Sequence, residues 1–198
     1  MLRIPSASLR KVTIQSYTID ERMGRLANLD TMALTQESGQ WKLAGAEKLN
    51  TAAVAAMAAA LDNLRIVDVR PKPPGLAKDL RSETLEVSLE TAVSLRQKRF
   101  LLTPNGRLLA NEGEMVIETA NGLAYVLRFG EIAAGSGESR YLFVTVSFDA
   151  ACAAKYGGDS ASGERQAREL TNRLADWYYV ISASDFAKLR LKRKDVAR

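Results

Sequence analysis

The alternation of apolar and polar positions predicts three strands near the start of the chain. In residues 11–19, Val12 and Ile14 alternate with polar residues, and the apolar positions change phase at Tyr17. Residues 31–36 and 40–44 show the same period of two. The connection between them, Glu-Ser-Gly-Gln, contains a glycine and is short enough for a hairpin. This block therefore indicates antiparallel strands.

A helical period follows in residues 51–64. Its apolar stripe has four members: Val54, Met57, Leu61 and Leu64. The other positions are mostly alanine, which favours helix and adds little bulk. Asn50 or Thr51 can cap the N-terminus. We expect this helix to lie close against a sheet, with its stripe in the core.

Three of the five prolines of the chain lie in the next segment, residues 67–81, VDVRPKPPGLAKDLR. Val67 and Val69 precede the prolines in strand alternation, and Leu76 and Leu80 follow them at helical spacing. Proline favours an extended conformation in the residue before it, whereas a long linker would be richer in glycine and serine. We interpret the segment as a stiff corner of the fold rather than as a linker or a polyproline ligand.

The second half of the chain predicts a helix, a strand meander, a further helix and a strand. The helix begins at Ser88, and its expected buried side consists of Leu89, Ala92 and Val93. Residues 99–111 and 114–132 read as two hairpins, with Gly106 in a left-handed conformation in the first and Asn121-Gly122 as the turn of the second.

The last three elements are a strand, a helix and an aromatic strand. Residues 140–148 carry apolar side chains on both faces, so we expect this strand to be covered on part of each face. Residues 149–163 are weakly patterned and indicate a loop or a short helix. The next helix has one predicted stripe: Ala167, Leu170, Leu174 and Trp177. An aromatic strand over 177–182 and a short helix over 184–189 end the pattern.

Strands that cluster apart from helices are typical of an α+β fold. We therefore expect a mainly antiparallel sheet, or sheets, with about three packed helices. The order leaves open two ββα-like subdomains that meet near the proline cluster. Residues 1–75 would contain the N-terminal strands and the alanine-rich helix, and residues 76–198 the remaining elements. The two segments can also form one compact domain.

Composition adds a mild basic excess to this picture. The 198 residues have a formal net charge of +5 and are 46% hydrophobic, an ordinary globular balance. Part of the excess lies near the C-terminus: Lys188, Arg190, Lys192, Arg193, Lys194 and Arg198. We expect a solvated, fraying end there. The alternative is a nucleic-acid-binding protein that uses this tail and the aromatic residues 177–179.

The chain has no histidine and a single cysteine, Cys152. The absence of histidine excludes Ser-His-Asp and Cys-His catalysis and the usual zinc sites. The single cysteine excludes an intrachain disulfide, and its alanine-rich surroundings indicate a small structural residue rather than a reactive thiol. We expect no cofactor and no metal.

Two short motifs invite a chemical interpretation. Gly158-Asp159-Ser160 is similar to the nucleophile region of some serine hydrolases, and Lys155 is the nearest base for a Ser-Lys scheme. The segment lacks the strand-turn-helix context of a nucleophile, so we favour a loop. Residues 135–139, GSGES, could bind an anion through backbone amides, but no patterned helix follows them. We therefore assign no catalytic, cofactor-binding or metal-binding residue.

Four segments together resemble the bacterial domain-of-unknown-function family numbered 4340. They read GQWKLAGAEKLNTAAVAAMAAALDNLRIVDVRPKPPGL, FLLTPNGRLLANEGEMVIETANGLAYVLRFGE, RYLFVTVSFD and ADWYYVISASDFAKLRLKRKDV. The resemblance extends from about Lys11 to Val196. Over this range the chain is similar to the C-terminal part of the larger family members. It brings no catalytic residue.

The resemblance implies an extracytoplasmic module of a larger protein with an N-terminal membrane anchor. Some members resemble or neighbour components of gliding-motility-type ABC transport systems. It therefore implies a protein or envelope partner at the periplasmic face, with this chain itself soluble. The chain departs from the family in two ways: it carries no anchor, and a short Ala/Gly/Ser stretch replaces the Lys/Glu-rich insertion after VTVSFD.

Overall fold

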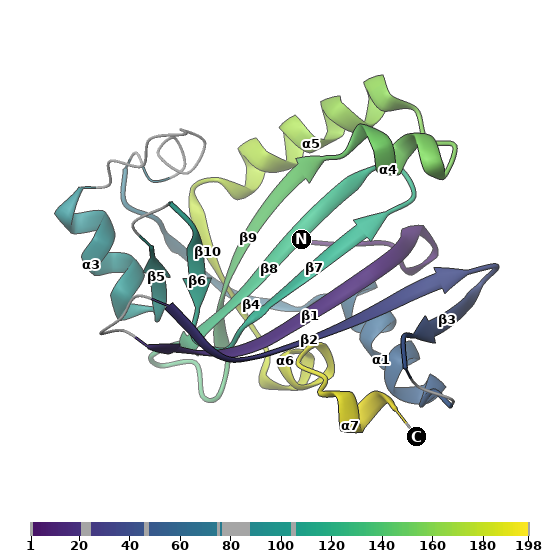
Figure 1. Cartoon of the computed structure of the whole chain (residues 1–198). Helices are drawn as coiled ribbons and strands as arrows, with labels where there is room; N and C mark the ends of the chain where they lie inside the picture. Colours follow the sequence, from purple (N-terminus) through teal and green to yellow (C-terminus); the bar gives the residue numbers. More distant parts are fainter. Residues whose placement is uncertain are drawn as a thin grey trace.

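The computed structural model describes residues 2–20, 25–45, 48–74, 76, 88–103 and 106–197. Within them, eight antiparallel strands form one sheet in the order β3-β2-β1-β7-β8-β9-β10-β4, and a β5-β6 hairpin stands apart (Figure 1). The strands are β1 (Leu9–Asp20), β2 (Arg25–Glu37), β3 (Gln40–Leu43), β4 (Ile66–Pro71), β5 (Phe100–Leu102), β6 (Leu108–Ala110), β7 (Glu114–Thr119), β8 (Leu123–Ile132), β9 (Arg140–Phe148) and β10 (Trp177–Ile181). This architecture confirms the predicted α+β fold with a mainly antiparallel sheet.

The helices in the described ranges outnumber the three that the sequence predicts, because several are short. They are a 3₁₀ turn, η1 (Ser6–Ser8), and the α-helices α1 (Thr51–Asp62), α3 (Leu89–Gln97), α4 (Ala150–Lys155), α5 (Ser160–Leu174), α6 (Ala183–Leu189) and α7 (Arg193–Val196). The weakly patterned residues 149–163 therefore contain α4 and the first turn of α5.

The N-terminal strands confirm the details of the hydrophobic pattern. The β1-β2 register shifts between Ser16 and Thr18, where the apolar positions change phase. Ser38 and Gly39 join β2 to β3, and both have positive φ, 49° and 78°. Positive φ at both central residues is the signature of a type I′ turn, whose twist matches that of paired strands.

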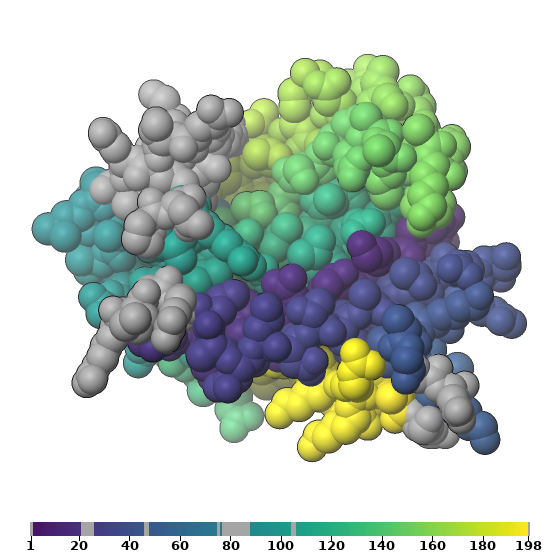
Figure 2. Space-filling model, in the orientation of Figure 1, coloured from purple at the N-terminus to yellow at the C-terminus, as the bar shows by residue number. Residues whose placement is uncertain are grey.

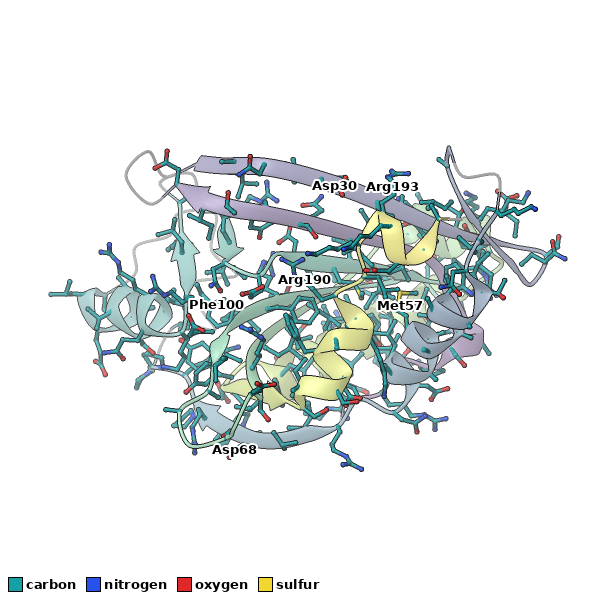
Figure 3. The ribbon with its side chains drawn as sticks, turned by 90° about the horizontal axis from the view of Figure 1, so that it is seen from below. Asp30, Met57, Asp68, Phe100, Arg190 and Arg193 are labelled. Carbon is teal, nitrogen blue, oxygen red and sulfur yellow. The ribbon has the colours of Figure 1, made fainter. Side chains whose placement is uncertain are left out.

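The first hydrophobic core lies between one face of the sheet and α1, α6 and α7. Figure 3 shows these three helices together on that face, with Met57 of α1 among them. Val54, Met57 and Leu61 are buried, which confirms the predicted stripe. The Asn50 side chain accepts a hydrogen bond from the Ala53 amide and caps α1.

Helix α5 lies beside the half of β9 that β10 leaves unpaired. The Thr171 hydroxyl donates to the Val146 carbonyl at 3.0 Å, and Ala167 and Leu174 are buried. The prediction that Trp177 continues this helical stripe is wrong. The helix ends at Leu174, and Trp177 begins β10 with its side chain 40% exposed.

A second, smaller core lies between the opposite face of the sheet, α3 and the β5-β6 hairpin. Its buried members are Leu76, Leu95, Phe100, Leu108, Ala110, Phe143 and Tyr178. The predicted buried side of α3 is wrong, because Leu89 is 82% and Val93 47% exposed. The helix faces the core through Thr91 and Leu95 instead. These two residues are also one helical turn apart, but they lie on a different side of α3 from the predicted one. Gly106, in the β5-β6 connection, has the predicted positive φ.

The C-terminal segment is packed, so the expectation of a fraying end is wrong for residues 188–197. Leu189, Leu191 and Val196 are buried against the first core. The Asn50 amide donates to the Val196 carbonyl at 2.7 Å, which ties α7 to the start of α1. These apolar positions recur among the basic residues, and the contacts they make hold the segment in place.

Strand pairing joins parts of the chain on both sides of residue 75. Strand β1 pairs with β7, and β4 pairs with β10. At the proline corner, the Leu76 amide donates to the Pro73 carbonyl at 3.3 Å and Leu76 is buried, whereas Leu80 lies outside the described residues. None of the helices in the described ranges is long and apolar enough to cross a membrane.

Candidate functional site

A groove of about 830 Å³ separates α1 from the β2-β3 hairpin. One wall is the alanine face of α1, which includes Ala55, Ala58 and Ala59, and the other is formed by Gln36 and Trp41. The sequence explains this shape. Most bulky residues of α1 point into the core, so the side that faces the hairpin consists mainly of alanine methyl groups, with Thr51 and Val54 beside them. The partly buried Trp41 supplies a broad apolar surface on the opposite wall.

A second hollow of about 650 Å³ adjoins the groove, because Ala7, Gln36 and Gly39 line both. Arg10 from β1 and Lys155 and Tyr156 from the end of α4 complete this hollow. Figure 1 shows α1, the β2-β3 hairpin and α4 at the same end of the sheet. We call the two hollows together the α1-hairpin groove and the second one its basic end.

Two cations lie near the Tyr156 ring at the basic end. The guanidinium carbon of Arg10 is 5.6 Å from the ring centroid, and Nζ of Lys155 is 5.2 Å from it. Nη1 of Arg10 donates to the carbonyls of Ala7 and Leu9 and to Oε1 of Gln36. These bonds fix the guanidinium group against the start of the chain.

The basic end also contains one carboxylate, that of Glu37. Its closest cation is Lys42, whose Nζ lies 2.6 Å from Oε2 across the hairpin. The hydrogen bond from Lys42 lowers the pKa of Glu37, and Lys155 adds a smaller effect in the same direction. Since Lys42 already pairs with Glu37, Arg10 and Lys155 give the basic end a net positive charge.

A second group of cations and aromatic rings lies in the smaller core. Nζ of Lys72 is 3.9 Å from the centroid of the Phe143 ring, and Nζ of Lys98 is 4.7 Å from that of Tyr178. The Ser94 hydroxyl accepts a hydrogen bond from Lys98 at 3.2 Å and lies 3.3 Å from the Tyr178 hydroxyl. Burial lowers the pKa of Lys72 from 10.5 to about 7, and the nearby charge of Asp176 opposes this shift.

A buried ion pair fixes the β5-β6 hairpin on the sheet. Glu114 is almost fully buried, and its Oε1 accepts a hydrogen bond from Arg107 at 2.9 Å. Its Oε2 lies 3.3 Å from Nε of Arg128, which donates its hydrogen bond to the Leu108 carbonyl instead. Burial lowers the pKa of Arg128, and the Glu114 charge counteracts the shift. This cluster joins three strands and has a structural explanation.

Among the described residues, no hydrogen bond joins Ser160 to Lys155, the pair that the sequence suggested for Ser-Lys chemistry. Ser160 and Lys155 are both exposed, on different helices, and Asp159 caps α5 by accepting from the Ala161 amide. Two amides of the loop at 135–139 form local hydrogen bonds, since Ser136 donates to the Ala133 carbonyl and Ser139 to the Ser136 carbonyl.

Cys152 is partly buried, and its thiol donates to the Thr119 carbonyl at 3.5 Å. Burial raises the pKa of this thiol, which disfavours the reactive thiolate. In the described ranges, no three acidic or cysteine side chains gather as metal ligands would.

A separate apolar surface lies on the edge strand β4. Val67 and Val69 are 45% and 40% exposed there, close to Trp177 at the start of β10. The backbone edge itself is protected. The Asp68 carboxylate accepts from the Val69 amide at 2.8 Å, and Pro71 has no amide proton to offer. Figure 3 shows Asp68 on this strand at the margin of the molecule.

The groove itself was not found by sequence reasoning. Arg10, Trp41 and Lys155 belong to three distant segments, and each looks ordinary within its own segment. The available signal was the distribution of large side chains on α1. They lie on one side of the helix, and alanines occupy the side that faces the predicted hairpin.

No protein-family model, curated protein or solved structure matches the chain.

Proposed function

We propose that this chain is a non-enzymatic protein-interaction module that binds a segment of a partner protein in the α1-hairpin groove. The observation that carries the proposal is the groove itself: a concave, uncharged channel lined by apolar and polar side chains, with cations at one end. Binding sites on proteins commonly combine a concave apolar surface with a few placed polar groups. The groove is open and lined on one side by small alanine side chains, which suits a chain segment better than an enclosed small molecule.

The cellular setting is part of the proposal and comes from the family resemblance. A member of that family would act at the extracytoplasmic face of a membrane-anchored, ABC-transport-associated assembly of the envelope. A module that holds a neighbouring subunit through a surface groove fits such a role. We therefore propose an envelope protein as the partner.

Photo-crosslinking in the cells that produce the protein tests this proposal. A benzophenone amino acid placed at Ala59, in the groove, should crosslink to a defined envelope protein. Placed at Val69, on the β4 surface, it provides the matched control. The added variant Ala55→Trp fills the groove and should abolish the crosslink from Ala59, while the melting temperature stays close to that of the wild type.

Two results would count against the proposal. A crosslink from Val69 but none from Ala59 would move the interaction to the edge strand. A crosslink from Ala59 that persists in the Ala55→Trp protein would show contact without occupation of the groove. A second groove-filling variant, Ala59→Trp tested by co-purification of the partner, covers the case in which Ala55→Trp fails to fold.

A further inference from the structure

The cations of the basic end have unused binding capacity. Among the described residues, every side-chain hydrogen bond of Arg10 comes from Nη1, so Nε and Nη2 remain available. Lys155 makes its close contact with the Tyr156 ring and forms no ion pair with a described carboxylate. Arginine binds a carboxylate best through two nitrogens, and two of its nitrogens are free here.

The alanine side of the groove suits a contact between helices. Ala55, Ala58 and Ala59 recur three and four positions apart, so they form one row along α1. Small residues allow two helix backbones to approach closely, and Trp41 on the opposite wall can cover an apolar side chain of the incoming segment. The groove thus favours an amphipathic helix as the bound element over a flat surface of a partner protein.

We infer that the partner segment is an acidic amphipathic helix, with its apolar side against the alanines of α1 and Trp41 and a carboxylate at Arg10 and Lys155. This inference rests on the proposed function, because it names the chemistry of the segment that occupies the same groove. The two cations favour a partner segment with negative charge, and the row of alanines favours a helical segment.

The charge count disfavours other classes of partner. A nucleic acid needs a series of phosphate contacts along its backbone, whereas the groove offers two cations at one end and an uncharged channel beyond them. An anionic membrane surface would need a wider basic face than these two residues provide. Both remain outcomes that the experiment can detect.

Selection from a library of helical peptides displayed on phage tests the inference. Peptides are selected on the wild-type chain and screened for loss of binding to Ala55→Trp, which isolates those that occupy the groove. We expect these peptides to combine Leu, Ile or Phe on one side with Asp or Glu near one end. Their affinity should fall about tenfold or more in the Arg10→Gln/Lys155→Gln protein, as expected when hydrogen bonds to charged groups are lost.

The matched control removes the same charge elsewhere. Arg165→Gln/Lys194→Gln changes two exposed residues outside the groove and should leave peptide affinity unchanged. Binding can be followed by the fluorescence of Trp41 in a Trp177→Phe background, because the chain has only these two tryptophans.

The outcomes separate the two proposals. Groove-dependent peptides without acidic residues, or with affinity that survives loss of both cations, would overturn the acidic partner and leave the interaction module standing. The absence of any peptide that depends on Ala55 would overturn both. Binding to anionic phospholipid vesicles or to single-stranded DNA that requires Arg10 and Lys155, without groove-dependent peptides, would replace the protein partner with a different class.

Discussion

Two tyrosines of this protein each have two cations beside the ring, and the surroundings give these groups opposite roles. Tyr156 has Arg10 and Lys155 within 6 Å and lines an open hollow. Tyr178 has Lys98 at 4.7 Å and Lys72 at 5.9 Å, but it is fully buried. Figure 2 shows the bulk of the molecule that separates the α4 end of the sheet from the α3 end.

The two groups differ in their access to solvent. Around Tyr178, the rings of Phe100 and Phe143 pack within 6.0 Å and exclude solvent, so burial lowers the pKa of both Lys72 and Lys98. Holding a charge there opposes folding, although the aromatic faces offset part of the cost. Around Tyr156 the cations keep contact with solvent and can exchange it for a ligand. The same chemical groups therefore serve packing at one end and remain accessible to a ligand at the other, where we propose recognition.

The largest expected difference between the two sites comes from removing the rings. Tyr178→Ala should destabilise the protein by about 3 kcal/mol or more, because it opens a cavity among Phe100, Phe143 and Leu95. Tyr156→Ala should cost less than about 1 kcal/mol, since a partly exposed ring leaves no closed cavity. Urea unfolding followed by circular dichroism measures both.

Tyr178→Phe serves as the control, because it keeps the ring and removes only the hydroxyl near Ser94. Equal losses of stability for Tyr156→Ala and Tyr178→Ala would mean that both rings belong to the packed core, and the contrast between the two ends would disappear.

The sequence predicts well what local periodicity controls. The phase change at Tyr17, the Ser38-Gly39 turn and the caps at Asn50 and Ser88 all follow from residues that are neighbours in the chain. Such signals depend on backbone geometry within a few residues, and the fold preserves them.

Periodicity does not predict which side of a helix is buried when the position of a covering element decides it. It gives the spacing of apolar residues on α3, but the β5-β6 hairpin covers the side with Leu95 and leaves Leu89 exposed. The candidate site is harder still, since Arg10 and Lys155 meet only because η1, the β2-β3 hairpin and α4 end at one place. Contacts of this kind arise from the order of strands in the sheet, which one sequence does not reveal.

A smaller effect concerns the pH dependence of stability. The pKa of Lys72 is about 7 in the folded protein and 10.5 in the unfolded chain. Below pH 7 both states hold the proton, and the full cost of the buried charge is present. Between pH 7 and 10.5 the unfolded state binds more protons, so stability rises with pH. Lys72→Met should therefore raise stability at pH 6 by about 2–4 kcal/mol and remove this rise.

Other groups titrate in the same range, so the informative quantity is the wild-type stability minus that of Lys72→Met at each pH. This difference should become less negative from pH 7 upward. Lys194→Met, at an exposed position, supplies the control difference, which should stay flat. A flat difference for Lys72 as well would mean that its ammonium is solvated, as we describe for Lys155.

The smallest effect on stability is expected at the basic end. Arg10→Gln/Lys155→Gln should change the free energy of unfolding by less than about 0.5 kcal/mol per residue, because charges that remain in contact with water contribute little to folding. Arg10 is the more sensitive of the two, since its Nη1 holds the Ala7 carbonyl at 3.0 Å and glutamine cannot reach as far. Thermal unfolding of the two single variants separates these contributions. A large loss in Lys155→Gln would make this lysine a structural residue, whereas unchanged stability with lost peptide binding assigns its charge to recognition.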